Sequence, residues 1–507
     1  MGRSVFIPAP TGGWNTRDPV FLMPDTDAQT VENIICETGY VRAKGGNNEF
    51  ADVSAGLSEV RTLQACKLEG GTEVFLAASR AGSTFKFWNI TAGGAGVDIS
   101  ATYDATAAAT DAVWQTCVYR HRIFGCNGSD RPFVWTGSGD VALAAWTGPG
   151  SNGTNLTSVQ PYRSRLYFCE ENNASIWYTS LVDAVTGALV EVPLDSVLHL
   201  GGFPIFAGSS SNRQGDTNQE LFVIYTTEGE VLVYQGRYPG DAGWSIVARY
   251  QIAPPLDYRC GTYVNNQLYL TTRMGPVGVH ELLGGADFEN AFEVESGKVR
   301  QAFLDASTTF SDKRTWQGIQ HKSKNYVLFN IPLVDASTAE QYVMNTITKA
   351  WSRLTGWSAQ CWGMFNGTLY YGEVNTGKVL EADAIFEVQN GTTLNWKIKH
   401  ASSFLGNPKS SKKTTLIQPI FTVEKESAAE TTDALTYGVD YDLEATSTLL
   451  PADFQVTSST EKLNKPILPL VGSGKSIAVR LEDSPTAAYD FRYYGSWLQV
   501  EDAEGLV

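Results

Sequence analysis

The feature that most constrains the fold is a two-strand unit that recurs along most of the chain. An apolar strand such as Arg165–Cys169, Gln267–Thr271 or Thr368–Gly372 precedes a tight turn and a second strand that ends in an aromatic residue or Leu. The unit returns at intervals of roughly 45 to 55 residues between about positions 56 and 400. One unit cannot bury both of its faces, so neighbouring units must stack. The sequence therefore predicts an all-β fold built around a β-propeller of six or seven blades.

The predicted strand pairs share alternating apolar residues on each side of a Gly-, Asn- or Glu-containing turn. They are 73–77 with 85–88, 121–125 with 133–135, 165–169 with 176–178, 221–225 with 231–234, 267–270 with 278–282, 326–329 with 341–344, and 368–372 with 378–381. Because the repeats are degenerate, a pair of irregular β-sandwiches stays open as an alternative.

The chain is long enough for more than one domain. Its 507 residues are 43% hydrophobic and 11% aromatic, and 48 glycines supply turns, a mixture that favours strands over helices. The amino-acid composition changes at Gly406-Asn407-Pro408, a turn-forming segment that is followed by a cluster of basic residues. We therefore predict an N-terminal arm over 1–55, a β-propeller over 56–400 and a β-sandwich-like C-terminal module over 401–507.

The C-terminal module contains three clear strand patterns, at Thr415–Phe421, Ile477–Leu481 and Ser496–Glu501. An acidic stretch separates the first two. Its members are Glu424, Glu426, Glu430, Asp433, Asp440, Asp442 and Glu444. We expect a solvated loop there, with a lumen or partner surface as the alternative.

The segment from residue 8 to residue 46 has an order of its own. Gly12-Gly13 can adopt positive φ before the anchor Trp14, and residues before proline, such as Asp18 and Met23, are extended. A short helix is predicted over Asp27–Ile35, capped by the preceding Asp or Thr. The segment leaves through an alternating strand at Tyr40–Lys44.

This arrangement resembles the amino terminus of tail hub proteins of short-tailed bacteriophages, also called nozzle or packaged-DNA stabilisation proteins. Those proteins open with a Pro-Gly-Gly segment, an Asn-Thr-Arg-Asp-Pro-like run, a Met-Pro and a short acidic helix, followed by a Gly-x-Val-Arg-x-Lys/Arg-Gly exit. The matching residues are Gly13, Asn15, Arg17, Asp18, Met23, Pro24, Asn33, Gly39, Val41, Arg42 and Gly45. The match is specific in this segment, whereas the rest of the chain resembles the family only in general character. An extended arm that leads into any other β domain could share some of these features.

The resemblance implies a structural virion protein of the tail, made in the host bacterial cytoplasm. It implies a ring of this chain, with six copies expected, below the head-to-tail adaptor protein, with tail fibres or a tailspike as further partners. The ring would extend the DNA channel, retain the packaged genome and later let it leave. Double-stranded DNA would pass through this channel without specific binding.

The net charge and the cysteine content are compatible with a tail hub protein, but they do not distinguish it from other functions. The formal net charge is −16, from 54 acidic and 38 basic residues. Affinity for nucleic acid requires Lys and Arg on phosphates, whereas carboxylates on a channel wall would keep DNA away from it. Seven scattered cysteines without metal-ligand spacing predict free thiols. We expect no signal peptide and no membrane-spanning helix, since no apolar run approaches about 18 residues.

Motifs for catalysis or cofactor binding fail in detail. Ser129–Pro132 and Ser138–Asp140 lack the Gly and Trp of a sialidase-type repeat. Gly472–Ser476 lacks the first Gly of a phosphate-binding loop, because Pro469 stands there, and is expected to be a hairpin turn. His280-Glu281 has no second His at 284. We therefore predict a non-enzymatic protein with no catalytic, cofactor-binding or metal-binding residues.

Two other functions stay open. A carbohydrate-binding or carbohydrate-hydrolysing propeller, such as a phage receptor-binding protein, would line a sugar groove with exposed Trp and Tyr. A cellular propeller would serve as a scaffold for other proteins.

Overall fold

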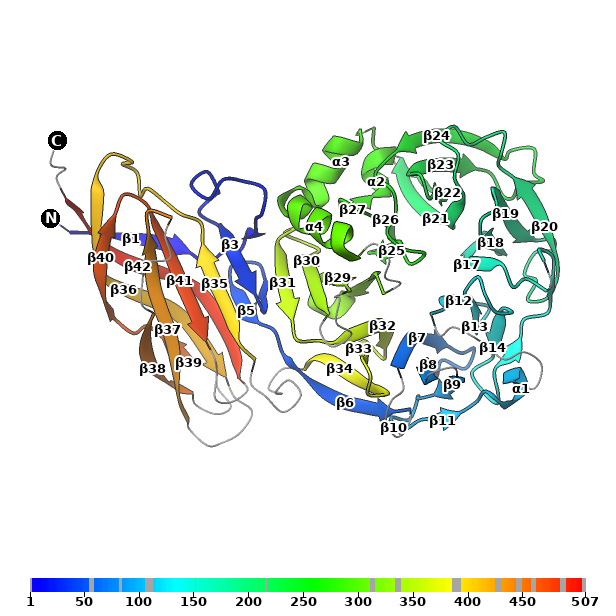
Figure 1. Ribbon diagram of the computed structural model, residues 1–507, viewed down its shortest axis with the longest axis horizontal. Helices are drawn as coiled ribbons and strands as arrows, with labels where there is room; N and C mark the ends of the chain where they lie inside the picture. Colours follow the sequence, from blue (N-terminus) through cyan, green and yellow to red (C-terminus); the bar gives the residue numbers. More distant parts are fainter. Residues whose placement is uncertain are drawn as a thin grey trace.

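The computed structural model describes residues 2–53, 59–81, 84–104, 113–150, 152–214, 217–285, 287–310, 315–332, 339–384, 394–424, 431–443, 449–456, 462–483 and 489–503. Two modules lie side by side (Figure 1): a ring of blades and a two-layered β module that contains both chain termini. Within the described residues no helix is long and apolar enough to cross a membrane.

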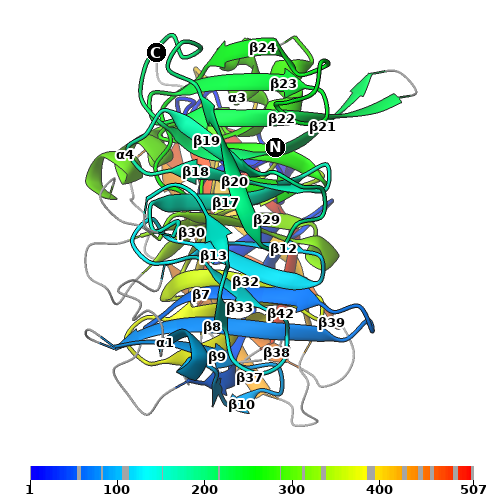
Figure 2. The ribbon, with the colours of Figure 1, turned by 90° about the vertical axis from the view of Figure 1, so that its right-hand side faces the viewer.

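The ring is a β-propeller, which confirms the predicted fold class. Within the described residues, six blades contain four or more strands each, and a seventh sheet of three strands completes the circle. The inner strands β7, β12, β17, β21, β25, β28 and β32 succeed one another around the axis, and the view in Figure 2 shows the blades edge-on.

The first four blades follow chain order. The first has β7 (Glu59–Lys67), β8 (Glu73–Ala81), β9 (Thr84–Asn89) and β11 (Val97–Asp98), and α1 (Ala101–Asp104) follows it. The second has β12 (Gln115–Tyr119), β13 (Arg122–Cys126), β14 (Phe133–Trp135) and β15 (Ala142–Leu143). The third has β16 (Trp146–Thr147), β17 (Leu156–Tyr162), β18 (Arg165–Glu170), β19 (Ser175–Thr179) and β20 (Gly187–Pro193). The fourth has β21 (Pro204–Gln214), β22 (Thr217–Thr226), β23 (Glu230–Gln235) and β24 (Ser245–Gln251).

The three remaining blades complete the ring. The three-stranded sheet has β25 (Gly261–Val264), β26 (Gln267–Thr272) and β27 (Gly275–Gly278). The helices α2 (Val279–Leu283), α3 (Phe288–Glu295), η1 (Gly297–Val299) and α4 (Arg300–Phe310) follow it. The sixth blade has β28 (Gln317–His321), β29 (Tyr326–Ile331), β30 (Glu340–Asn345) and β31 (Trp351–Thr355), with η2 (Lys322–Lys324) between its first two strands. The last has β32 (Ala359–Phe365), β33 (Thr368–Glu373), β34 (Lys378–Ala384), β6 (Gly46–Asp52) and β10 (Gly94–Ala95).

The last blade is closed by strands from distant parts of the chain. The N-terminal β6 pairs antiparallel with β34, with Ala51 opposite Val379. This closure corrects the predicted arm: residues 46–52 belong to the propeller and not to a separate segment. A strand taken from the other end of the propeller sequence ties the first and last blades into one ring, which leaves no open seam between them.

The second module is a β-sandwich. One sheet has β1 (Arg3–Pro8), β4 (Ile34–Cys36), β5 (Val41–Ala43), β36 (Ser411–Glu424), β39 (Lys462–Asn464), β40 (Leu468–Gly474) and β42 (Asp490–Ala503). The facing layer has β3 (Asp27–Glu32), β35 (Trp396–His400), β37 (Thr431–Tyr441), β38 (Leu450–Val456) and β41 (Ile477–Asp483). Its core joins side chains of both layers, including Phe421, Phe491 and Leu481, all fully buried. Because β35 pairs with β41, residues 396–400 lie in the sandwich and not in the predicted propeller.

The predicted helix over Asp27–Ile35 is wrong, because this stretch forms β3 and β4. Helical spacing of Ala28, Val31 and Ile35 suggested one apolar face, yet all three are buried among strands on both sides. Tertiary hydrogen bonding therefore overrides the local pattern. Asn33, at φ 57°, separates the two strands.

Two other local predictions are corrected, and two further predictions are confirmed. The predicted strand at 278–282 is instead the short helix α2, while the other predicted strand pairs form. Gly472–Ser476 is not a hairpin turn, since β40 pairs with β36 while β41 pairs with β35 and β37, so the chain changes layers there. All seven cysteines are buried free thiols, as predicted.

Candidate functional site

The segment that resembles the hub family joins the two modules. β2 (Gly13–Trp14) and β3 lie between β31 of the propeller and β35 of the sandwich, so one ten-stranded sheet runs from a blade into the sandwich. Gly13 pairs with both Asp27 and Trp351, and Val31 pairs with Ile398. We call the region where β2, β3 and β5 contact β31, β34 and β35 the junction.

Two glycines permit the close approach of strands at the junction. Gly13 has φ 85°, and a Cβ atom there would lie 2.5 Å from the backbone nitrogen of Trp351. A Cβ atom on Gly45 would lie 2.5 Å from the carbonyl oxygen of Ala384. Both neighbours are backbone atoms that cannot rotate away, so a side chain at either position forces strands apart.

Asn15 organises the turn that follows Gly13. Its Oδ1 accepts hydrogen bonds from the backbone N–H groups of Arg17 and Asp18, both at 3.0 Å. Its Nδ2 donates to Asp18 at 2.9 Å and to the buried Asp27 at 2.8 Å. Lys298, which lies between α3 and α4, reaches the same Asp27 at 2.9 Å. The Asn-x-Arg-Asp pattern thus builds an internal turn.

Replacing Asn15 by Ala is expected to lower the free energy of unfolding by about 1–3 kcal/mol, because it removes a hydrogen bond to the buried Asp27 and the acceptor of the Arg17 and Asp18 N–H groups. The measurement is urea denaturation followed by circular dichroism. The control is Asn407→Ala, which removes a similar acceptor for the Lys409 N–H in an exposed turn and is expected to cost less than about 0.5 kcal/mol. Equal losses for the two variants would contradict the role assigned to Asn15.

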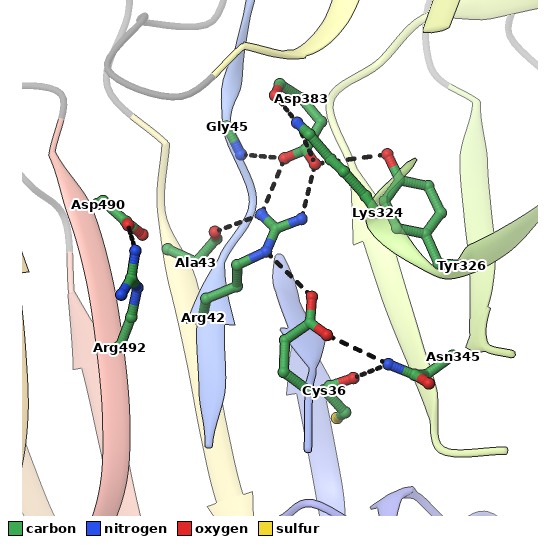
Figure 3. Close-up of polar contacts among 11 residues, drawn as sticks. Cys36, Arg42, Ala43, Gly45, Lys324, Tyr326, Asn345, Asp383, Asp490 and Arg492 are labelled. Carbon is green, nitrogen blue, oxygen red and sulfur yellow. Dashed lines mark hydrogen bonds and ion pairs between the residues drawn. The ribbon is translucent and has the colours of Figure 1, made fainter. Parts of the chain in front are cut away.

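A buried ion pair connects β5 to the last blade (Figure 3). Arg42 donates two hydrogen bonds to Asp383, at 3.1 and 2.7 Å, and a third to the Ala43 carbonyl oxygen. The Arg42 side chain is 8% exposed and that of Asp383 is 0% exposed. Such a two-pronged arrangement fixes geometry as well as charge. It holds the N-terminal segment against the end of β34.

Asp383 has three further partners. The Gly45 N–H donates to it at 2.6 Å, Lys324 Nζ lies 2.9 Å away, and Tyr326 donates at 3.4 Å. Burial alone would raise the pKa of Asp383, but the charges of Arg42 and Lys324 and these hydrogen bonds hold that pKa well below its usual range. The carboxylate is therefore ionised in the folded protein, with its charge compensated by two cations.

Contacts of Glu37 and Asn345 connect the N-terminal segment to β30 as well. Arg42 lies 3.4 Å from Glu37, and Asn345 donates to Glu37 at 3.3 Å and to the Cys36 carbonyl at 2.9 Å. Burial raises the pKa of Glu37, and the charge of Arg42 opposes that shift. Three blade strands and the N-terminal segment are thus connected through side chains.

Lys44 and Asn33 complete the connection beside these carboxylates. Lys44 is 4% exposed, donates to the Thr355 carbonyl and lies 4.1 Å from the centre of the Trp357 ring. Burial lowers the pKa of its amine well below the ordinary value. Asn33 bonds to Thr355 and, through Nδ2, to the Asn395 carbonyl at 2.8 Å. The Asn33 amide and the Lys44 amine therefore hold the N-terminal segment to the end of β31, and Asn33 also holds the residue just before β35.

The structure places the residues of the family-like motif in or next to the junction. Met23 and Val41 are buried, Gly39 adopts φ 88°, Arg17 pairs with Asp18 and Glu293, and the Pro24 carbonyl accepts from the Asp27 N–H. Their partners Lys298, Lys324, Trp351 and Asp383 were missed by sequence reasoning and carry no local signal. The arrangement positions the two modules relative to each other.

The acidic stretch does not form one surface. β37 contains Asp433 and Asp440, which are buried, so the predicted solvated loop is wrong for these two residues. Asp440 lies 2.8 Å from Lys399, and Asp442 accepts from the Lys475 and Ser476 N–H groups. The alternating pattern of β37 places Leu435, Tyr437 and Val439 in the core and makes this segment a strand. Glu424 ends β36, and Glu426, Glu430 and Glu444 lie outside the described residues.

The central channel of the propeller contains a cavity of about 520 Å³. Arg259 crosses one part of it: its Nη2 donates to the Arg61 carbonyl, to Thr62 Oγ1 and to the Trp114 carbonyl at 2.9–3.1 Å. Its Nη1 lies 3.4 Å from Gln317 Oε1. The guanidinium therefore connects four blades across the axis. Among the described residues, no group of three His, Cys, Asp or Glu is arranged to hold a metal ion.

Comparisons with known proteins give structural neighbours only. No family model and no curated protein matches the sequence. BBS1N, solved in complex with ARL6DN, is 12% identical over 68% of this chain and 97% of its own, with a TM-score of 0.38. YCF48, solved bound to D1 peptide, is 8% identical over 68% of this chain and 100% of its own, with a TM-score of 0.36. An exo-β-1,3-galactanase from Phanerochaete chrysosporium, solved with galactose, is 7% identical over 76% of this chain and 95% of its own, with a TM-score of 0.23. Similarities this low carry no argument about what this chain binds or does.

Proposed function

We propose that this chain is a structural subunit of the tail hub, or nozzle, of a short-tailed bacteriophage. The observation that carries the proposal is the position of the family-like segment. Gly13, Asn15, Arg42 and Gly45, which match the hub pattern, all lie at the junction of propeller and sandwich. The motif therefore marks a particular two-module architecture and not merely an extended arm.

The proposed work of the protein is geometric. Six copies form a ring below the head-to-tail adaptor, extend its DNA channel, retain the genome and release it on infection. A closed ring needs two different contact surfaces on each copy, and a rigid junction keeps those surfaces at a fixed angle. The formal charge of −16 in each copy keeps phosphates away from the channel wall, so DNA passes without being gripped.

In this assembly the DNA passage lies between copies and not through the propeller. The channel cavity of about 520 Å³ has the size of a small-molecule pocket. A DNA duplex, whose major groove alone is about 12 Å wide, would have to displace the Arg259 contacts to three other blades. The propeller is accordingly a wall element of the proposed ring.

Native mass spectrometry of the full chain, alone and mixed with its cognate adaptor ring, tests the proposal. We expect a six-copy ring, formed by the chain alone or on the adaptor. A chain that stays monomeric in both samples would overturn the hub function. Cleavage of host surface polysaccharide by the monomer would instead support a receptor-binding enzyme.

A further inference from the structure

A pocket beside the junction has features of a binding site that the proposed assembly role does not use. It is lined by α4, by the strands β30 and β31 of the sixth blade, and by Trp14 of β2. Its volume of about 390 Å³ falls within the roughly 300–1,000 Å³ of small-molecule sites. We call it the α4 pocket.

Small and aromatic side chains form the apolar part of the α4 pocket. Ala302 and Ala306 lie one turn apart on α4 and leave space that larger side chains would fill. Trp14 and Tyr342 meet edge to face, with their ring centres 5.3 Å apart. Aromatic walls with a few polar groups beside them are typical of small-molecule sites.

The hydroxyl of Tyr342 is available to a ligand in this pocket. Tyr342 is only 6% exposed, yet within the described residues its hydroxyl makes no hydrogen bond, and it is not one of the polar atoms sealed from solvent. Burial raises the pKa of Tyr342, the nearby charges of Glu340 and Asp305 act in the same direction, and that of Arg353 acts against it. Three charged groups, from α4 and from the blade, therefore gather near this hydroxyl.

Asp305 and Arg353 supply an acceptor and a donor. One carboxylate oxygen of Asp305 accepts from Gln301 Nε2 at 2.8 Å, and within the described residues the other has no partner. Arg353 uses Nε and Nη2 to bind Glu340, whereas its Nη1 lies 3.9 Å from Glu32, beyond hydrogen-bond distance. Both side chains are open to solvent, since Asp305 is exposed and the Arg353 side chain is 38% exposed.

This combination of groups favours a neutral ligand over a charged one. A small anion would face Asp305 and Glu340, and a small cation would face Arg353. A neutral ligand with several hydroxyl groups can donate to the carboxylate, accept from the guanidinium and do both with the Tyr342 hydroxyl. Its apolar face can pack against the aromatic wall.

We propose that the α4 pocket binds one or two rings of a neutral saccharide. The sugar hydroxyls donate to the unpaired oxygen of Asp305, accept from Arg353 Nη1 and bond to the Tyr342 hydroxyl, while a C–H face packs against Trp14. Because Trp14 belongs to β2 and Arg353 to β31, the bound sugar connects the N-terminal segment to the blade. Binding needs no ring of copies, so its test is independent of the proposed hub function.

The test is isothermal titration calorimetry of the full chain with glucose, galactose, mannose, N-acetylglucosamine and maltose, and with citrate and argininamide as charged probes. We expect saturable binding of at least one neutral sugar at millimolar concentration, accompanied by a change in Trp fluorescence. Both charged probes should bind more weakly than that sugar or not at all. Binding of no neutral sugar, or a charged probe that binds as tightly as the best sugar, would overturn the proposal.

Two variants place the site. Tyr342→Phe removes only the free hydroxyl, so we expect binding about fivefold weaker with no loss of thermal stability, since that hydroxyl has no bond to lose. Asp305→Ala, an exposed change on a helix, is expected to weaken binding about tenfold. The control is Tyr250→Phe, which removes a hydroxyl from a half-buried tyrosine of β24, away from the pocket. Unchanged binding in either pocket variant, or equal weakening in the control, would overturn the assignment.

Discussion

Replacing Asp383 by Asn is expected to lower the free energy of unfolding by about 3–5 kcal/mol, the cost of breaking a buried ion pair by removing one partner. The variant leaves the Arg42 guanidinium buried and removes the carboxylate that Lys324 also contacts. Asn suits this test because Asp383 has φ 55°, a left-handed conformation that Asn tolerates. The substitution therefore changes charge and leaves shape and backbone strain nearly unchanged.

The measurement is urea denaturation followed by circular dichroism and Trp fluorescence. The control is Asp502→Asn, which breaks the Arg3–Asp502 pair, 3.6 Å apart, whose side chains are 45% and 48% exposed. Exposed pairs contribute at most about 1 kcal/mol. A loss for the 383 variant no larger than that of the control would mean that the junction is not held by its buried charges.

The same variant has a defined pH dependence. In the folded protein the pKa of Asp383 is held below its usual range, whereas in the unfolded chain it returns to about 3.9. Its stabilising contribution is thus present above the unfolded pKa and is lost as the pH falls toward the folded one. The difference in unfolding free energy between wild type and Asp383→Asn should be constant from about pH 5 to 8 and shrink below about pH 4. A constant difference down to pH 2 would contradict this assignment.

Local patterns predicted the propeller well because its hairpins join neighbours in sequence. The pair 165–169 with 176–178, for example, lies within one blade as β18 and β19. Alternation of apolar residues and a turn between them is all the information such a pair needs. At 278–282 the same reasoning failed, because Val279 and Leu282 are buried by a short helix with a spacing of three residues.

The junction could not be predicted from local patterns. Arg42 and Asp383 are 341 residues apart in the chain, and nothing around Asp383 distinguishes it from other acidic residues. The segment 27–36 looked helical because its partners, β31 and β35, come from the far end of the sequence. The resemblance identified which N-terminal residues matter, whereas only the structure gives what they contact.

Replacing Gly13 by Ala is expected to destabilise the protein by about 3 kcal/mol, from two separate causes. A non-Gly residue at φ 85° carries strain of about 1–2 kcal/mol. The new Cβ atom would also lie 2.5 and 2.6 Å from the backbone nitrogen and oxygen of Trp351, and overpacking of this kind costs about 1–3 kcal/mol. The clash falls where β2 connects a blade to the sandwich.

Gly39→Ala separates the two causes, because Gly39 has φ 88° and, apart from its chain neighbours, no atom of the described residues lies within 4 Å of its Cβ position. Its substitution introduces the backbone strain alone, so we expect a loss of about 1–2 kcal/mol. The difference between the two variants, measured by thermal and urea denaturation, then reports the contact with Trp351. Equal losses would mean that β2 and β31 can separate freely. In that case the family-like glycine would serve only the turn, and the junction would depend on Arg42 and Asp383 instead.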